Sequence, residues 1–208
     1  MPGRFLTALT LLACVAAGAC ASARLELRTL QQDEREVLRA VIRHMQADKD
    51  EPEREPAIVD GSMEIMRDYH LFPDAEALRE EAQMSDVEFR FPLEVFPDVI
   101  RRNQRRASLA QLVGEATGAR WVSQLQMDSL DAAERRELNA TRRLLAQMHP
   151  GARSVNQLSR PGFDEPRRYA AVAYGYSCGD LCGAAGVYLM ERRDGRWRVI
   201  TRIPMIVS

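Results

Sequence analysis

The hydrophobic periodicity of the chain changes at His149-Pro150-Gly151. Before this tripeptide, apolar residues recur at helical spacing and predict a helix over about 131–148. Proline removes a helical hydrogen bond, and glycine readily adopts the positive φ angle of a helix C-terminus, so the tripeptide ends that helix. Every segment after Gly151 is typical of β-structure. The order of elements predicts an α+β protein, with N-terminal helices packed on a sheet that is β-rich from about residue 152.

The C-terminal segments have the alternation of an antiparallel sheet. Arg193-Asp194-Gly195 is the strongest hairpin signal, because Asp-Gly adopts the positive φ angles of a tight turn. We expect an antiparallel β-meander of about four strands, with helices on its apolar face. The expected strands are Val155–Ser159, Tyr169–Tyr176, Gly186–Arg192 and Trp197–Ile203, with a turn over Arg160–Pro166 and a loop over Cys178–Gly183.

Upstream, the patterns predict helices with two short strands between them. Asp33 and Glu36 have the spacing of a capping box and predict a first amphipathic helix over about 33–48. Asp128 or Ser129 is expected to cap the helix that ends at Met148. The other expected elements are a strand over Ala57–Asp60, a helix over Ala75–Met84, a helix near 97–105 and a strand over Arg120–Gln126.

The N-terminus has the three-part layout of a secretory signal peptide, over residues 1–23. A positive start is followed by an apolar run over Phe5–Ala17 and then by small residues. That run is too short to cross a hydrocarbon core of about 30 Å comfortably. We therefore expect an exported protein whose single α+β domain covers residues 24–208.

Two processing outcomes for this signal stay open. Ala17-Gly18-Ala19-Cys20 resembles a bacterial lipobox, and cleavage before Cys20 would leave an acylated cysteine as the first residue. Leu11-Leu12-Ala13-Cys14 has the better leader residue but shortens the apolar run, so Cys20 is preferred. Ordinary cleavage after Ala23 would release a protein that begins at Arg24. The protein is thus expected in the periplasm or anchored by lipid to an envelope membrane.

The composition is that of an ordinary globular protein. Hydrophobic residues make up 46% of the 208 positions and charged residues 28%, and this length can bury a substantial core without a metal or disulfide. The formal charge is −1, from 29 Lys and Arg against 30 Asp and Glu, and the two signs are interleaved along the sequence. Nucleic-acid binding normally requires a concentrated basic footprint, so no nucleic-acid partner is expected.

Cys178 and Cys182 form the best candidate pair in the mature chain. Export places them in an oxidising compartment, and a turn between two strands can bring their Cα atoms close enough for a disulfide. A thiol-redox couple is less well supported, because that chemistry usually has two residues between the cysteines, at a helix N-terminus. A metal site lacks nearby histidine partners, so the pair is interpreted as a structural disulfide.

Several residues of the last third resemble a known group of proteins. They are Leu158-Ser159, Gly162-Phe163-Asp164, Tyr174, Cys178, Cys182-Gly183, Gly186, Leu189, Gly195, Trp197, Val199 and Ser208. The pattern is similar to that of uncharacterised exported bacterial proteins and lipoproteins with a tail of Ser, Gly-Phe-Asn, a strand, a glycine-rich and sometimes cysteine-bearing loop, and Gly-x-Trp-x-Val. The sequence departs from this group in two places. Asp164 stands where asparagine is usual, and the end of the chain contains Pro204-Met205-Ile206. The resemblance covers roughly the last 60 residues and implies the fold alone.

No residue is assigned a catalytic role, and no metal or cofactor is expected. His44, His70 and His149 lack metal-ligand spacing, and Trp197, Tyr174, Tyr176 and Tyr188 are expected in the core more than in a ligand groove. The leading interpretation is a non-enzymatic envelope protein that binds an unknown protein or small ligand and reaches a membrane only through a lipid on Cys20. The alternative is a periplasmic hydrolase or thiol-redox enzyme that uses Ser159 and the region of Cys178, Asp180 and Cys182.

Overall fold

The computed structural model describes residues 4–47, 55–63, 91–114, 117–137, 140–179 and 182–207. The helices are α1 (Arg4–Ala47), α3 (Val95–Arg102), α4 (Leu109–Val113), α5 (Gln124–Glu134) and α6 (Ala140–Met148). The strands are β1 (Glu55–Val59), β2 (Arg120–Val122), β3 (Ala152–Leu158), β4 (Gly162–Phe163), β5 (Tyr169–Gly179), β6 (Cys182–Arg193) and β7 (Arg196–Val207). Helices and strands are both present, so the α+β class is supported. The predicted helix over Ala75–Met84 lies outside the described residues.

The sheet is larger than predicted and is mixed. It has seven strands in the order β2-β1-β3-β5-β6-β7, with β4 paired to β5, so the expectation of about four strands was wrong. β1 runs parallel to both β2 and β3, and the other pairs are antiparallel. Two of the seven, β1 and β2, lie close to the strands that were predicted separately over Ala57–Asp60 and Arg120–Gln126. They extend the meander at its β3 edge through parallel pairs, which need long crossover connections.

The β6–β7 hairpin forms where it was predicted. Arg193 pairs with Arg196, and the two residues between them have positive φ angles, 51° at Asp194 and 73° at Gly195. Such angles match the twist of the flanking strands. The register then shifts twice along β7. Leu189 pairs with Thr201 and Met190 with Val199, and the second shift lies between Ala185 and Gly186. β7 is therefore an edge strand with two irregularities in its pairing.

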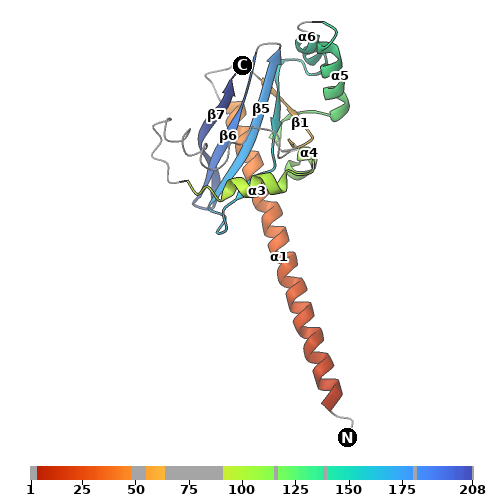
Figure 1. Ribbon diagram of the computed structural model, residues 1–208, viewed down its shortest axis with the longest axis vertical. Helices are drawn as coiled ribbons and strands as arrows, with labels where there is room; N and C mark the ends of the chain where they lie inside the picture. Colours follow the sequence, from red (N-terminus) through yellow and green to blue (C-terminus); the bar gives the residue numbers. More distant parts are fainter. Residues whose placement is uncertain are drawn as a thin grey trace.

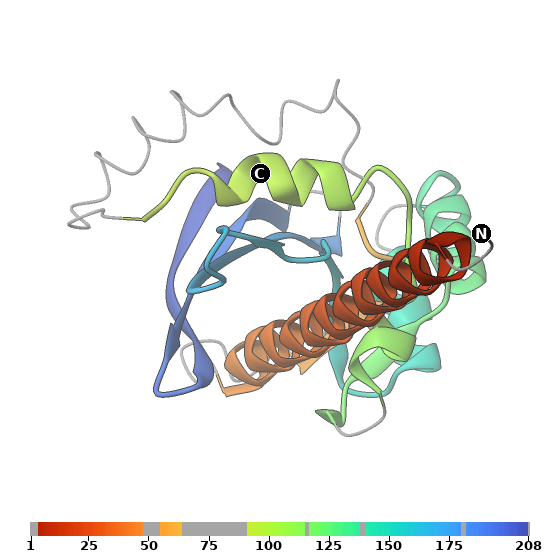
Figure 2. The ribbon, with the colours of Figure 1, turned by 90° about the horizontal axis from the view of Figure 1, so that it is seen from below.

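Helices cover both faces of the sheet, and not only one (Figures 1 and 2). Along β5, alternate residues face opposite sides: Val172 packs in the cluster that contains the α1 residues, and Ala173 in the cluster that contains the α3 residues. α5 and α6 pack with β1, β2 and β3 in a third cluster. Because four of the five described helices follow β1 in the chain, the expectation of N-terminal helices alone was also wrong.

α1 begins well before the predicted start at residue 33. The predicted stripe of Val37, Leu38, Val41 and Ile42 is buried against the sheet. The predicted capping box at Asp33 and Glu36 was wrong, because both residues lie inside a helix that is already formed upstream. The N-terminal part of α1 projects away from the body (Figure 1). Among the described residues, no helix has the length and apolar character needed to cross a membrane.

The predicted helix over 131–148 is two helices. Ser123, and not Asp128 or Ser129, caps α5: its Oγ accepts from the backbone N–H of Gln126, whose side chain accepts from the N–H of Ser123. The carboxylate of Glu134 accepts from the backbone N–H of Thr141 near the start of α6. α6 ends before His149-Pro150-Gly151, as predicted, and Gly151 has a φ of 87°.

Candidate functional site

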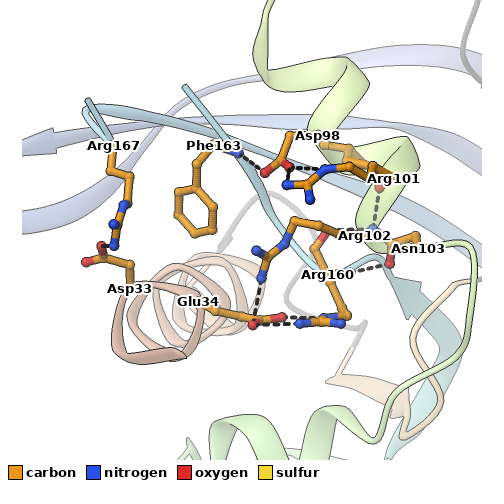
Figure 3. A network of polar contacts seen from close by, with 10 residues as sticks. Asp33, Glu34, Asp98, Arg101, Arg102, Asn103, Arg160, Phe163 and Arg167 are labelled. Carbon is orange, nitrogen blue, oxygen red and sulfur yellow. Dashed lines mark hydrogen bonds and ion pairs between the residues drawn. The ribbon is translucent and has the colours of Figure 1, made fainter. Parts of the chain in front are cut away.

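The most extensive group of buried charges in the described residues lies where α1 enters the body (Figure 3). Glu34 is only 1% exposed. Its carboxylate accepts from Nη2 of Arg102 at 2.7 Å and from Nε and Nη2 of Arg160 at 2.6 and 3.1 Å. Charge-assisted and bidentate contacts of this kind are among the stronger polar interactions in proteins. They join three elements: α1, the end of α3 and the segment between β3 and β4.

The two guanidinium groups around Glu34 respond differently to their surroundings. Burial lowers the pKa of Arg102, and the charge of Glu34 opposes this effect. The hydrogen bond from Arg160 to Glu34 raises the pKa of Arg160, against the effect of its partial burial. Both groups stay cationic at any physiological pH, because arginine titrates far above it. Glu34 therefore serves as the counter-charge that allows Arg102 to be buried.

Asp33, the neighbour of Glu34, makes a second set of ion pairs. One of its oxygens lies 3.4 Å from Nη1 of Arg167, and the other lies 3.2 Å from Nη1 of Arg192. Arg167 belongs to the β4–β5 turn, and Arg192 to the end of β6. The guanidinium of Arg192 also lies over the ring of Trp197, 5.9 Å from its centroid. Adjacent carboxylates on α1 thus contact arginines from four different parts of the body.

α3 is attached to the same region by two polar side chains. Asn103 donates to the carbonyl oxygens of Val99 and Arg160 and accepts from the backbone N–H of Arg160 at 2.7 Å. Asp98 accepts from the backbone N–H of Phe163 at 3.0 Å and pairs with Arg101 (Figure 3). These bonds fix the end of α3 against the segment that leads into β4.

The segment from Ser159 to Asp164, which contributed to the resemblance, has a structural role at every polar position. Oγ of Ser159 accepts from the backbone N–H of Ala173 at 2.8 Å, and Ser159 has no exposed surface. A Cβ on Gly162 would lie 2.3 Å from the backbone nitrogen of Val99, so only glycine allows this approach to α3. Asp164 accepts from the backbone N–H groups of Arg168 and Tyr169 and so orders the β4–β5 turn.

Cys178 and Cys182 lie at the far end of the β5–β6 pairing. Ser177 pairs with Gly183 and Gly179 with Cys182, so the connection between the strands is shorter than the predicted loop over Cys178–Gly183. The side chain of Cys182 and all of Asp180 lie outside the described residues. The disulfide between Cys178 and Cys182 therefore stays a prediction. Cys20 lies in α1, and its lipidation also stays a prediction.

The two histidines within the described residues, His44 and His149, contact different elements. The ring of His44 meets Tyr188 edge-on with centroids 5.8 Å apart, and His149 follows α6, where its backbone N–H donates to Leu145. His70 lies outside the described residues. Within the described part of the chain, no group of three or more His, Cys, Asp or Glu side chains has the arrangement of a metal site.

The aromatic residues weighed for a ligand groove belong mainly to the core. Tyr174, Tyr188 and Trp197 are each at most 5% exposed, and Tyr176 packs against the same cluster. The rings of Tyr174 and Tyr188 have centroids 4.7 Å apart. Burial raises the pKa of Tyr174 to about 12, although the charge of Arg202 acts in the opposite direction.

Sequence reasoning missed the ion pairs of Asp33 and Glu34. The signal present in the sequence was two adjacent acidic residues beside the apolar stripe of a helix, where a carboxylate must be buried with a partner. The arginine partners are 68 and 126 positions from Glu34, and nothing in the local pattern identifies them.

No family model matches the chain, and no curated protein or solved structure is significantly similar to it.

The network is suited to holding elements together and not to chemistry on a substrate. Glu34 is inaccessible, and its carboxylate already accepts three hydrogen bonds. The hydroxyl oxygen of Ser159 accepts a hydrogen bond from the backbone of β5. What the arrangement does is fix α1 to the sheet, to α3 and to the turn that precedes β5.

Proposed function

We propose that this chain is an exported cell-envelope protein that acts by binding a protein partner or a small ligand, and not by catalysis. The leader over residues 1–23 is removed in one of two ways. Cleavage before Cys20 leaves an acylated cysteine that holds the protein on a membrane. Cleavage after Ala23 releases a periplasmic protein that begins at Arg24. The lipidated form is preferred.

The observation that supports the anchored form of this proposal is the continuity of α1. The helix runs from Arg4 to Ala47, and Asp33 is the first buried side chain among those described in it. Cys20 is 13 positions before Asp33, which corresponds to about 20 Å of helix. An acyl chain on Cys20 would therefore be joined to the body by a short helical spacer, whose far end is fixed by the ion pairs of Asp33 and Glu34.

The structure weakens the hydrolase or thiol-redox alternative at Ser159, one of the residues on which it depends. Ser159 is fully buried and accepts from the backbone of Ala173, so it offers no accessible nucleophile. The alternative then depends on Cys178 and Cys182, which we propose form an inert disulfide. Alkylation of the native protein before reduction tests this pair: both cysteines should stay unlabelled, and labelling of both would contradict the disulfide.

The anchoring proposal is tested by expressing the full chain in a Gram-negative bacterium and determining the mass of its mature N-terminus. The expected product starts with a diacylglyceryl Cys20 and fractionates with membranes. When membranes are washed in high salt, which screens electrostatic attraction, Cys20→Ala should move the protein to the soluble fraction, whereas the matched variant Cys14→Ala should not. A product that starts at Arg24 would support the periplasmic form. Recovery of the intact leader in the cytosol would overturn export altogether.

A further inference from the structure

Arginines that are scattered along the sequence are gathered by the fold at one end of the sheet. Tyr169 pairs with Glu191 and Arg193 with Arg196, which brings the β4–β5 turn beside the β6–β7 hairpin. The backbone N–H of Arg192 donates to the carbonyl of Arg168 at 2.7 Å. We call this surface the arginine-rich end. It consists of Arg167, Arg168, Arg192, Arg193, Arg196 and Arg198.

The charge of this end is positive even after its acidic neighbours are included. The carboxylates on or beside it are those of Glu165, Glu191, Asp194 and Asp33. Six arginines against four carboxylates leave a net charge of +2, although the whole chain has −1. Asp33 is buried against Arg167 and Arg192, so it contributes little to the outer surface. The exposed positive positions are Arg168, Arg192, Arg193, Arg196 and Arg198, and of these only Arg192 pairs with Asp33.

The arginine-rich end lies on the side of the body from which α1 projects. Asp33 contacts arginines of both the β4–β5 turn and the end of β6, which fixes the exit point of the helix at this end. Figure 1 shows the hairpin and the turn on the side of the body from which α1 leaves, and Figure 2 views that side directly. α5 and α6 lie at the other end of the body (Figure 1). The charge therefore lies at the end of the body from which the segment that carries Cys20 projects, although α1 slants away from the hairpin (Figures 1 and 2).

We infer that the arginine-rich end docks on anionic phospholipid headgroups and orients the body on the membrane surface. This inference rests on the proposed lipid anchor at Cys20, which would place a bilayer on this side of the body. Basic side chains near an anionic leaflet are attracted to it, and the attraction decays within a Debye length, about 8 Å at physiological ionic strength. A spacer of about 20 Å standing upright would hold the arginines beyond that range. The inference thus requires α1 to lean, so that the tip of the β6–β7 hairpin reaches the headgroups.

Footprinting of arginines tests the inference within one molecule and without substitutions. The full chain, as recovered from bacterial membranes, is reconstituted in vesicles of phosphatidylglycerol and phosphatidylcholine or of phosphatidylcholine alone. It is then labelled with an arginine-specific dicarbonyl reagent and digested. Labelling of Arg168, Arg193 and Arg196 should fall at least about threefold in the anionic vesicles and recover in high salt. Labelling of Arg135, Arg136 and Arg142, exposed on or beside α5 and α6, should not change.

A pair of matched variants provides the second measurement. Arg168→Gln/Arg193→Gln/Arg196→Gln and Arg135→Gln/Arg136→Gln/Arg142→Gln remove the same charge from opposite ends. In the full chain with Cys20→Ala, only the first triple change should weaken partition to anionic vesicles, by about tenfold. Equal labelling at both ends, or equal partition of the two variants, would overturn the inference. Protection by soluble polyglutamate without protection by anionic vesicles would also overturn it, in favour of a soluble acidic polymer.

The digest also reports the N-terminus, so failure of the anchor and failure of the docking surface can be told apart. An acylated Cys20 with unprotected arginines would leave the proposed function intact and overturn the inference. A lipid-free N-terminus with arginines protected by anionic vesicles would remove the anchor, and the docking surface would stand without it.

Discussion

At the scale of single residues, the attachment of α1 depends on charges that are shielded from water. Glu34 is surrounded by Arg102 and Arg160, and the side chain of Arg102 is only 7% exposed. Desolvating an ion pair costs about as much as the pair gains, so such a pair adds little when it is intact. Removing one partner lowers the free energy of unfolding, because the other charge is then left buried without a counter-charge.

The first prediction follows from this asymmetry. Glu34→Gln keeps the size of the side chain and removes its charge, and we expect the free energy of unfolding to fall by about 3 kcal/mol. Urea denaturation followed by circular dichroism measures the change. Glu137→Gln is the control, since Glu137 pairs with Arg143 on the surface and its loss should leave the midpoint unchanged. Equal effects of the two substitutions would show that the burial of Arg102 does not require the charge of Glu34.

The second prediction concerns pH and Tyr174. Its pKa is raised from 10.0 to about 12 by burial, so the folded protein keeps this proton at pH values where the unfolded chain has lost it. The free energy of unfolding should therefore fall between about pH 10 and about pH 12, by about 2 kcal/mol from this residue alone. Below pH 10 the residue makes no pH-dependent contribution, because both states are protonated.

Comparison with Tyr174→Phe isolates this contribution from those of the other tyrosines. The variant lacks the titrating hydroxyl, so its stability should decline less steeply than that of the wild type over the same pH range. Parallel pH profiles of the two proteins in denaturant titrations would contradict the raised pKa.

At the scale of elements, local sequence predicted where several helices and strands end and was less informative about where they begin. His149-Pro150-Gly151 and Asp194-Gly195 were interpreted correctly, because each imposes a backbone conformation on a few neighbouring residues. Asp33 with Glu36 has the pattern of a helix start, yet both residues lie inside α1. A capping pattern specifies only local bonds, and a helix that continues upstream makes those bonds unnecessary.

The third prediction tests the observed start of α5 against the predicted one. Ser123→Ala removes the acceptor of the capping box and should lower the free energy of unfolding by about 1 kcal/mol. Ser129→Ala is the matched change at the position that the sequence favoured. Its hydroxyl donates to the carbonyl of Leu125 within the helix, so this change should be neutral or slightly stabilising. Thermal unfolding of both variants decides between the two positions. A larger loss of stability for Ser129→Ala than for Ser123→Ala would contradict Ser123 as the N-cap of α5.

At the scale of the whole molecule, the arrangement of layers could be predicted only in part. Alternation along Trp197–Ile203 suggested one buried and one exposed sheet face. In the structure, Ala170–Tyr174 of β5 and Gly186–Met190 of β6 are buried on both faces, which is why these segments are apolar without alternation. The parallel pairing of β1 and the ion pairs of Glu34 join distant parts of the sequence, and no local pattern specifies such contacts.

The fourth prediction uses this layering. Amide hydrogen exchange should be slowest in β5 and β6, which are covered by α1 on one face and by α3 on the other. Within α1, residues 37–42 should exchange more slowly than residues 26–32, where only Leu30 packs against the core. Mass spectrometry of peptic peptides resolves these segments. Equal protection of residues 26–32 and 37–42 would contradict the projection of the N-terminal part of α1 from the body.

The irregular pairing of β7 has a consequence for how this protein behaves when many copies are close together. A long, straight strand at the border of a sheet can recruit a neighbouring chain through its free backbone groups and so begin a fibril. Here the ladder is offset twice, arginines occupy outward positions, and Pro204 has no amide hydrogen to donate. A second β7 cannot be matched to the first over its whole length. Close packing of many copies should therefore not convert the protein into stacked sheets.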